Sequence, residues 1–489
     1  MRLQLALLPL LATPVKAAPL DIFDAGAAAL TAVEQWFGPH DELVDPDRAH
    51  LLVADGDEEA VVHELTVSQG FSDYHGAMAG ICTLRARGGG ADDTDNFVNT
   101  MKRCGKNSVI FMNSPVYNIR RPVKIRLENS VLSLSGWLKF SDDIEYWVQH
   151  AFDLGFQNQK LAMVVSGSNF VLNGEDTGGI DGSGQAWYDY ARGVGNVHGR
   201  PMSLALIGAR NAVVTNWGIR QPQFWAHIAV DSDNVVYESC YVNATSTSGS
   251  FEEKSWLQNT DGIDTYRTND VVISNFVYQG GDDCIAFKPN STNIVVQNVT
   301  CVGGTGIAFG SIAQYDGVKD LIENVVLKDI KLYPSDQCRG YQGVYFKSWI
   351  GEEVGHPPNG GGGGYGYCRN VSVEDVYMED IDRPLALTAG LTYLDDEHGK
   401  HKYGMFEWSH INITRVRATS TGNRAIWLDC SPTQPCHHIR LKDVVVTPGK
   451  SDHPEIHQVC NFVMHSEGDG LEGCKPNNST LESDTGGTM

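Results

Sequence analysis

Residues 270–302 read DVVISNFVYQGGDDCIAFKPNSTNIVVQNVTCV, a stretch in which two β-branched runs begin at Asp270 and Asn293, 23 residues apart. The runs that begin at 211 and 234 repeat this spacing, and further runs begin at 321, 370, 410 and 438. Short strands in series with no helical pattern between them indicate a sandwich, a propeller or a solenoid. A period in the low twenties, with asparagine recurring at the turns, favours the solenoid. We therefore predict an all-β fold, a right-handed parallel β-helix whose coils stack about 4.8 Å apart.

The repeats divide the chain into four parts. Residues 1–18 have the basic start, apolar run and small residues that are typical of a secretory signal peptide. Residues 19–79 lack the repeat and are interpreted as an N-terminal extension or cap, and residues 80–475 are predicted to form a single β-helix domain. The polar residues 476–489 are predicted to be a disordered tail. Within the domain, 88–105 predicts a turn followed by a short capping helix, and the glycine-rich residues 357–367 predict a flexible loop.

The net charge limits the kinds of partner that this protein can bind, and the glycosylation motifs indicate where it is located. The formal net charge of −23 over 489 residues argues against a nucleic acid or an anionic membrane as a partner, and against a polyanionic substrate unless the site carries its own positive charge. After the signal peptide no apolar run reaches the ~20 residues that span a bilayer. Asn-x-Ser/Thr motifs indicate a secreted, extracellular glycoprotein; they lie at Asn243, Asn290, Asn298, Asn370, Asn412, Asn477 and Asn478. We expect a monomer.

Eleven cysteines in a secreted chain predict disulfides. Proximity in the sequence suggests the pairs Cys82–Cys104, Cys284–Cys301, Cys430–Cys436 and Cys460–Cys474, and the odd count leaves at least one cysteine outside them. The cysteine and histidine spacings do not match a structural zinc site, so we predict no metal.

Three aspartates are the candidate catalytic residues. Asp282 and Asp283 are adjacent, and Asp261 precedes Asp283 by 22 residues, which is about one coil. An isolated Asp-Gly is most simply a turn, but three carboxylates on stacked coils repel one another, and folding alone gives no reason for that cost. Such a cluster pushes pKa values apart, so that one carboxyl keeps its proton while another stays ionised. Hydrolysis of a glycoside needs one acid for the leaving oxygen and one base for water.

The motifs NTDGIDTY (259–266), GGDDCIAFKPNSTNIVVQN (280–298) and GGTGIAFGSIAQY (303–315) resemble, in this order, those of glycoside hydrolase family 28, the polygalacturonases and their exo-acting fungal relatives. The resemblance covers roughly residues 80–460. It implies a β-helix and hydrolysis with inversion, without metal or cofactor. It also implies that Asp282 is the general acid, that Asp261 and Asp283 activate water, and that Asn259 orients the neighbouring carboxylate. For inversion the acid and base carboxyls should lie ~6.5–9.5 Å apart across a cleft.

Two positions depart from the family pattern. Where the family has Gly-His-Gly, this chain has Thr305 between two glycines, and where the family has Arg-Ile-Lys, it has Tyr345, Phe346 and Lys347. Thr305 and Tyr345 are then expected to contact substrate, and Lys347 is expected to bind a substrate carboxylate as a point charge. A threonine cannot replace the charge of a histidine, which puts a galacturonate at the cleaved position in doubt.

These departures favour an exo-acting α-L-rhamnosidase that acts on rhamnogalacturonan-type pectin. The alternative is an exopolygalacturonase (galacturan 1,4-α-galacturonidase), which the motifs as a whole resemble most. A polysaccharide-binding β-helix without activity is the remaining interpretation, and the three retained aspartates argue against it. The exo mode is expected from the resemblance and from the loop at 357–367 and the N-terminal segment, either of which could close one end of a groove. The expected partner is a pectic oligosaccharide or polysaccharide.

Overall fold

The computed structural model describes residues 80–248, 256–394, 403–450, 455–469, 471 and 474. All of them belong to one of the two compact units of the chain, Pro46–Met489. The predicted signal peptide, N-terminal cap and C-terminal tail lie outside the described residues, as do Asn477 and Asn478. None of the helices in the described ranges has the length and apolar character needed to cross a bilayer.

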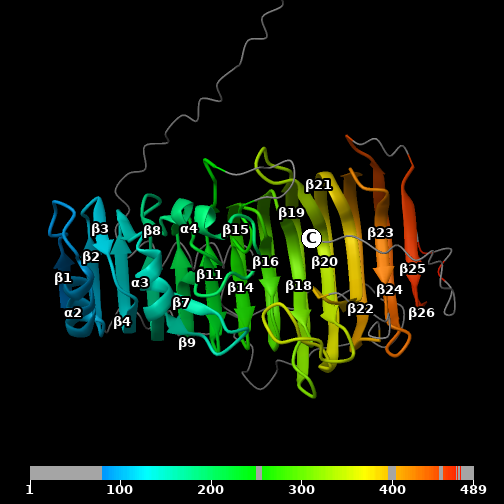
Figure 1. Ribbon diagram of the computed structural model, residues 1–489, viewed down its shortest axis with the longest axis horizontal. Helices are drawn as coiled ribbons and strands as arrows, with labels where there is room; N and C mark the ends of the chain where they lie inside the picture. Colours follow the sequence, from blue (N-terminus) through cyan, green and yellow to red (C-terminus); the bar gives the residue numbers. More distant parts are fainter. Residues whose placement is uncertain are drawn as a thin grey trace, which may run out of the picture. The chain divides into compact units, whose positions relative to one another are not determined.

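Parallel strands stack in sequence order, as Figure 1 shows from β1 at the blue end to β25 and β26 at the red end. The first stack contains β1 (Gly80–Leu84), β2 (Ser108–Met112), β4 (Val123–Leu134), β7 (Lys160–Asn173), β9 (Pro201–Thr215), β12 (Asp233–Glu238), β15 (Asn269–Gln279), β17 (Ser291–Val302), β19 (Lys319–Tyr333), β21 (Tyr365–Leu391), β22 (Met405–Ser420) and β24 (Cys436–Pro448). The second contains β3 (Val116–Ile119), β5 (Trp137–Phe140), β8 (Gly179–Asp181), β10 (Gly218–Arg220) and β13 (Tyr241–Asn243), and it continues in the later parts of β15 and the longer strands after it.

The third stack is called the site sheet, because it carries the predicted site residues. It begins with parts of β4, β7 and β9 and continues with β11 (His227–Val230), β14 (Ile263–Tyr266), β16 (Asp283–Phe287), β18 (Thr305–Ile312), β20 (Gly340–Trp349), the end of β21, β23 (Arg424–Asp429) and β25 (His457–Asn461). The short β6 (Phe152–Asp153) pairs antiparallel with β7, and β26 (Val463–Met464) and β27 (Glu467–Gly468) pair with β24. The parallel pairing confirms the predicted parallel β-helix.

Helices are few and short in the described residues: α2 (Thr94–Cys104), α3 (Ile144–His150) and α4 (Gly184–Ala191). Helix α2 confirms the helix predicted within 88–105, and it packs its buried Phe97 and Met101 into the first coils. The glycine-rich residues before β21 form the predicted loop, which connects β20 to β21.

Strand alternation separates the core from the outer face of the site sheet. Ile285 and Phe287 of β16 are buried inside the coil, so Ala286 and Lys288 point to the opposite side. Behind the outer face the rings of Phe287, Phe309 and Phe346 contact one another coil on coil, edge to face at 5.0 Å and then stacked at 4.4 Å between centroids, and we call this row the aromatic stack. The ring of Trp408 continues the stack at 5.5 Å. This aromatic stack supports the strands that carry the site.

Asparagines form ladders at the turns, where the chain takes positive φ values that asparagine tolerates. Asn129 donates to Asn107, and Asn169 to Asn129, each at 3.0 Å. Further steps join Asn211 to Asn169, Asn234 to Asn211, Asn324 to Asn293 and Asn370 to Asn324. The ladder explains why asparagine recurs with the coil period in the sequence.

Glycosylation stays a prediction at the five motifs that the structure describes. Asn243 and Asn298 are exposed, whereas Asn290, Asn370 and Asn412 are half-buried. The amide nitrogen that would carry a glycan is engaged at two of them, because Asn298 donates to Asn275 at 2.6 Å and Asn370 donates within the ladder. Among these five positions, Asn243 is the most favourable glycosylation site, because it is exposed and its side chain is not part of such a bond.

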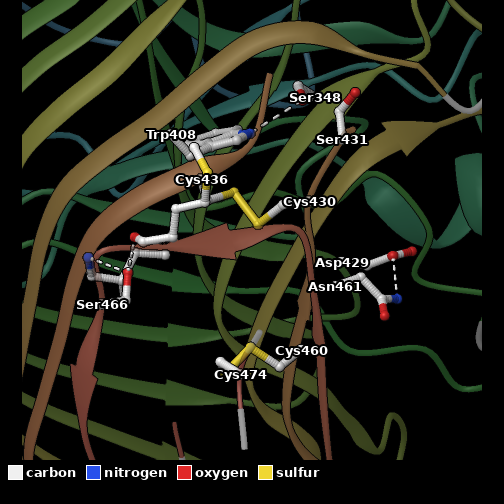
Figure 2. Close-up of a disulfide and its surroundings, with 12 residues drawn as sticks. Ser348, Trp408, Asp429, Cys430, Ser431, Cys436, Cys460, Asn461, Ser466 and Cys474 are labelled. Atoms are coloured by element: carbon white, nitrogen blue, oxygen red, sulfur yellow. Dashed lines mark hydrogen bonds between the residues drawn. A yellow bond between two sulfur atoms is a disulfide. The ribbon is translucent and has the colours of Figure 1, made fainter. Parts of the chain in front are cut away.

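The four predicted disulfides, Cys82–Cys104, Cys284–Cys301, Cys430–Cys436 and Cys460–Cys474, are all present. In the described residues, Cys240, Cys338 and Cys368 are buried and form no disulfide. Figure 2 shows the two bridges of the last coils, together with the bond from Asn461 to Asp429 at 2.9 Å. Half of the disulfides therefore strengthen the C-terminal end of the solenoid.

Candidate active site

Three aspartates meet at the start of two neighbouring strands of the site sheet. The register of β14 with β16 pairs Ile263 with Ile285, and this register brings Asp261 opposite Asp283 on the next coil. One carboxylate oxygen from each of Asp261, Asp282 and Asp283 lies within 4.8 Å of the others. Asp261 and Asp283 are buried, whereas Asp282 is partly exposed. Asp282 is therefore the carboxyl of the three that a bound molecule reaches most directly.

The carboxylates are closer together than predicted. The rule for inverting glycosidases gives ~6.5–9.5 Å between acid and base, whereas oxygens of all three groups lie within 4.8 Å. The predicted spacing is wrong because it assumed two carboxyls facing each other across a cleft. Here they come from adjacent positions on two stacked coils. The anomer of the product, rather than this spacing, decides the stereochemistry.

Asn259 lies beside Asp282, as the resemblance implied. Its backbone N donates to Asp282 Oδ2 at 2.8 Å, and its Nδ2 approaches the same oxygen at 3.5 Å. The other oxygen of Asp282 accepts from the backbone N of Asp283 at 2.9 Å. Asn259 has a φ of 58°, in the left-handed region that asparagine enters more readily than most residues. These bonds fix the orientation of the Asp282 carboxyl.

Two buried lysines neutralise the cluster. Lys347 Nζ lies 2.9 and 3.2 Å from the two oxygens of Asp283. Lys288 Nζ lies 3.3 Å from Asp264 and 3.7 Å from both Asp261 and Asp283. Burial by itself would lower the pKa of each lysine, but the adjacent carboxylates outweigh it and raise both pKa values above the ordinary one. Both ammonium groups therefore stay charged.

Burial raises the pKa of three carboxyls in the cluster. The pKa of Asp261 lies well above its ordinary value because of burial and then of Asp282, and the pKa of Asp282 is raised by burial and then by Asp283. Burial raises the pKa of Asp264 to about 7, although Lys288 opposes the shift. Carboxyls that interact this closely titrate as a group. Raised pKa values of this kind are what a general acid requires.

The other predicted substrate-binding residues lie on the next two coils. Thr305 is in register with Asp283, and its hydroxyl donates to Gln342 Oε1 at 3.1 Å. Tyr345 lies beside Lys347, whose Nζ is 5.2 Å from the ring centroid. The structure brings all of these residues to the cluster. It also places the Lys347 ammonium, expected to bind a substrate carboxylate, against Asp283.

Sequence reasoning missed two residues that the quoted motifs contain. Asp264 and Lys288 stand in NTDGIDTY and GGDDCIAFKP, and strand alternation sets both on the outer face together with Ala286. Both residues could therefore have been predicted from the strand alternation. Lys288 also lies over the ring of Trp225, at 4.6 Å from its centroid.

Arg200 is a further missed cation, and no local motif marks it. Its side chain is fully buried, with Nε donating to Gln223 O at 2.8 Å and Nη1 to Gln258 O at 3.0 Å. Burial lowers the pKa of Arg200 to about 10, so it remains charged at neutral pH, and Asp282 and Asp261 are the carboxylates that act on it. The fold therefore directs a third positive charge toward the aspartates.

The three aspartates also have the spacing of a possible cation site. Lys347 and Lys288, however, place ammonium groups 2.9 and 3.7 Å from Asp283. These groups supply the positive charge that a divalent cation would bring, and they would repel such a cation. The arrangement fits proton transfer among carboxyls.

Asn196 links the catalytic coil to a distant loop. Its backbone N donates to Asn259 Oδ1 at 2.6 Å, and its Nδ2 donates to Asn359 Oδ1 at 2.9 Å. Asn259 precedes β14 and Asn359 follows β20, so the two partners lie at opposite edges of the site sheet. We call residues 194–200, which lead into β9, the crossing segment. It joins the coil of β14 to the loop that follows β20.

Neighbouring contacts reinforce this crossing. Gln314, just after β18, donates to Pro358 O and Gly360 O at 3.1 and 2.9 Å, and accepts from Gln157 Nε2 at 2.6 Å. Aromatic side chains including Phe156, Phe224 and Trp225 cover the outer face of the earlier coils. The earlier end of the site sheet is therefore covered.

The later coils are different. The register of β20 with β21 places Arg383 opposite Gln342, in line with Thr305 and Asp283. The guanidinium groups of Arg383 and Arg424 both lie 4.4 Å from the ring centroid of Trp427. These three side chains are partly exposed. The outer face is thus accessible and cationic on the C-terminal side of the aspartates.

Known proteins share this sequence and fold. The model of glycosyl hydrolases family 28 matches residues 119–466. The chain is 43% identical over 380 residues to a putative galacturan 1,4-alpha-galacturonidase A of Aspergillus flavus, which covers 74% of this chain and 87% of that protein. It is 30% identical over 378 residues to the alpha-L-rhamnosidase rgxB of Aspergillus niger, and this alignment covers 77% of this chain and 86% of that protein.

A solved structure shares the fold. The endo-xylogalacturonan hydrolase of Aspergillus tubingensis superimposes with a TM-score of 0.67 at 21% identity, over 82% of this chain and all of that one. Because the family model spans most of the solenoid and includes the aspartate cluster, the chain belongs to glycosyl hydrolases family 28.

Proposed function

We propose that this glycoside hydrolase is an exo-acting pectin hydrolase that releases galacturonate from the end of a galacturonan chain. One observation carries the proposal. The aspartate cluster lies between a covered end of the site sheet, where Phe156, Phe224 and Trp225 fill the outer face, and an open end that carries Arg383 and Arg424. A chain end would fit under the crossing segment, and the rest of the polymer would extend over the later coils.

The covered end supports the exo mode. A polymer that lay across the aspartates in mid-chain would need room on both sides of Asp282. On the earlier side the outer face is filled by Phe156, Phe224 and Trp225, and the crossing segment is bonded beside the site to Asn259 and Asn359. Only one sugar unit or a few would then lie beyond the bond that is cleaved.

Galacturonate is preferred here over rhamnose, which reverses the order favoured by the sequence. Rhamnose was favoured because Thr305 and Tyr345 stand where the family has a histidine and an arginine. Lys347 was then the only predicted cation left to bind a substrate carboxylate. The structure pairs Lys347 with Asp283, and it places the partly exposed Arg383 and Arg424 on the later coils, where a substrate carboxylate can reach them. The relatives support the same order, because the protein that is 43% identical is named as a galacturonidase and the rhamnosidase is 30% identical.

The geometry gives each carboxyl a step. Asp282, fixed by Asn259 and with a pKa raised by burial, would donate its proton to the glycosidic oxygen as the bond from that oxygen to the anomeric carbon breaks. Asp261 and Asp283 would hold a water whose oxygen attacks the anomeric carbon and whose proton passes to one of them. The products are a free sugar and a polymer shortened by one unit, and the proton returns to Asp282 through solvent.

The same proposal includes the location. The four disulfides and the predicted N-terminal signal peptide favour an enzyme that is secreted and acts outside the cell.

A product assay tests the proposal. Purified enzyme is incubated separately with oligogalacturonates and with rhamnogalacturonan oligomers, and the products of the first minutes are identified by chromatography. We expect galacturonic acid as the only small product of the first substrate. Release of rhamnose without galacturonic acid would restore the rhamnosidase interpretation, and early products of mixed length would exclude the exo mode.

A further inference from the structure

The asparagine ladder becomes a histidine ladder at the C-terminal end of the solenoid. The registers of β21, β22, β24 and β27 align Asn370 with His410, His410 with His438, and His438 with His465. The four residues have φ values of 58°, 53°, 55° and 47°, so they occupy the same turn position. The rings of His410 and His438 stack with centroids 4.7 Å apart, and those of His438 and His465 lie 5.8 Å apart.

A third imidazole completes a cluster on this surface. His437 Nδ1 lies 2.7 Å from His438 Nδ1, and one ring nitrogen from each of His410, His437 and His438 lies within 4.8 Å of the others. His437 also turns its Nε2 toward Glu407 Oε1, at 3.4 Å. Histidine ligands of metals commonly donate their second ring N–H to a carboxylate, which fixes the tautomer. His410 and His438 are exposed, so an ion from solution can reach the cluster.

We propose that His410, His437 and His438 form a binding site for a divalent transition metal, with Zn²⁺ as the ion to test. Three imidazoles match the nitrogen preference of zinc, copper and nickel, and Zn²⁺ in such sites completes its coordination with water or a carboxylate. Nitrogens within 4.8 Å of one another reach metal-ligand separations through small side-chain rotations. The site is separate from the aspartate cluster and does not depend on the proposed function.

The ion would join two coils near the end of the solenoid. His410 and Glu407 lie on β22, whereas His437 and His438 lie on β24, which neighbours it in the stack (Figure 1). End coils of a solenoid have a neighbour on one side only and need additional stabilisation. The two disulfides of this region serve the same need (Figure 2). A search for zinc motifs in the sequence does not find the site, because His410 and His438 are 28 residues apart, which is one coil.

Metal binding by the intact enzyme tests the site. Protein without a histidine tag is treated with EDTA, passed through a desalting column and titrated with ZnCl₂ by calorimetry. We expect one Zn²⁺ per chain and a melting temperature that rises with zinc concentration. In His410→Asn and His438→Asn, Zn²⁺ should bind at least about tenfold more weakly, since even outer-shell losses cost 10–100-fold. Asparagine suits the positive φ at both positions, so the fold should persist.

His465→Asn is the matched control, because it replaces a ladder histidine outside the cluster. It should bind Zn²⁺ within about twofold of the wild type, whereas Glu407→Gln should weaken binding about 10–100-fold. Absence of stoichiometric binding by the wild type would overturn the proposal. Equal affinity in the wild type, His410→Asn and His438→Asn would overturn it as well.

Discussion

Asp282 is the one catalytic candidate that is both partly exposed and held by two backbone N–H groups, those of Asn259 and Asp283. Its partners Asp261 and Asp283 are buried, and Lys347 neutralises Asp283. The three aspartates thus lie in one cluster but have different surroundings. Differences in environment, rather than in residue type, divide the roles of acid and base.

We expect Asp282→Asn to abolish hydrolysis while the protein stays folded, because an amide cannot give a proton to the leaving oxygen. Asp261→Asn and Asp283→Asn should also lose most activity. Combining the last two should add little to either loss, since both residues act on one water. Initial rates on oligogalacturonates check this, and circular dichroism with a melting curve confirms the fold. Near-normal turnover in a folded Asp282→Asn enzyme would exclude the acid assignment.

Asp264 connects the site to stability. Its pKa is about 7 in the folded protein against an ordinary value of 3.8, so between these pH values the folded state binds a proton that the unfolded state has lost. Stability should therefore fall as pH rises from 3.8 to about 7. In Asp264→Asn this fall should be smaller, as measured by urea midpoints at several pH values. Asp443→Asn, at an exposed position of β24, is the control, and equal slopes in all three proteins would contradict the expectation.

Arg383 tests the leaving side of the site. It lies three coils beyond Asp283, or about 14 Å at 4.8 Å per coil, so only longer oligomers reach it. Losing a hydrogen bond to a charged group costs about 1.5–3 kcal/mol. Arg383→Gln should therefore raise KM for long oligogalacturonates roughly tenfold or more and leave digalacturonate nearly unchanged. Arg415→Gln, whose guanidinium pairs with Glu374 and Asp375, is the control. A loss that is independent of oligomer length would contradict a distal contact.

At the scale of elements, strand alternation explains how two lysines join the site. Phe287 and Phe346 point inward, so Lys288 and Lys347, the next residues along each strand, point outward toward the aspartates. The spacing of 22 residues identified the pairing of Asp261 with Asp283, because one coil separates them. Alternation within the same motifs would also have identified Asp264 and Lys288. Arg200 could not be found in this way, since its position depends on how residues 194–200 cross the sheet.

The aromatic stack behind the site offers a prediction for stability. Phe346 is buried between Phe309 and Trp408, with ring centroids at 4.4 and 5.5 Å. Phe346→Ala should destabilise the protein by about 3–5 kcal/mol, because the cavity would interrupt the stack. Tyr345→Phe, one residue away on the outer face, removes only a hydroxyl and should cost about 1 kcal/mol or less. Chemical denaturation measures both. Similar losses in the two variants would show that the stack is not a main support.

For the whole molecule, a repeated strand pattern predicts a solenoid well, because every coil makes the same contacts with its neighbours. The parallel β-helix, the four disulfides and helix α2 follow from such local signals. Contacts between distant segments do not. Asn196 bonds to Asn359 across 163 positions of sequence, and no periodicity links the two. The contact that is proposed to close one end of the site was therefore expected only in general terms, from the length and glycine content of the loop.

The crossing segment gives the last prediction. Asn196 has a φ of 53°, so glycine accommodates its backbone, and Asn196→Gly keeps the backbone bond to Asn259 while removing the side-chain bond to Asn359. One such hydrogen bond is worth about 1 kcal/mol, which changes the population of an opened form roughly fivefold. Early digestion of pentagalacturonate should then also yield dimers and trimers, which the wild type is not expected to release.

Asn359→Ala breaks the same bond from the other side and should shift the products equally, whereas Asn412→Ala, on β22, should not. If both crossing variants release only the monomer, as the wild type is expected to do, Asn196 and Asn359 do not close the groove. The exo mode would then have to come from the aromatic cover over the earlier coils, where Phe156 and Trp225 fill the outer face of the sheet.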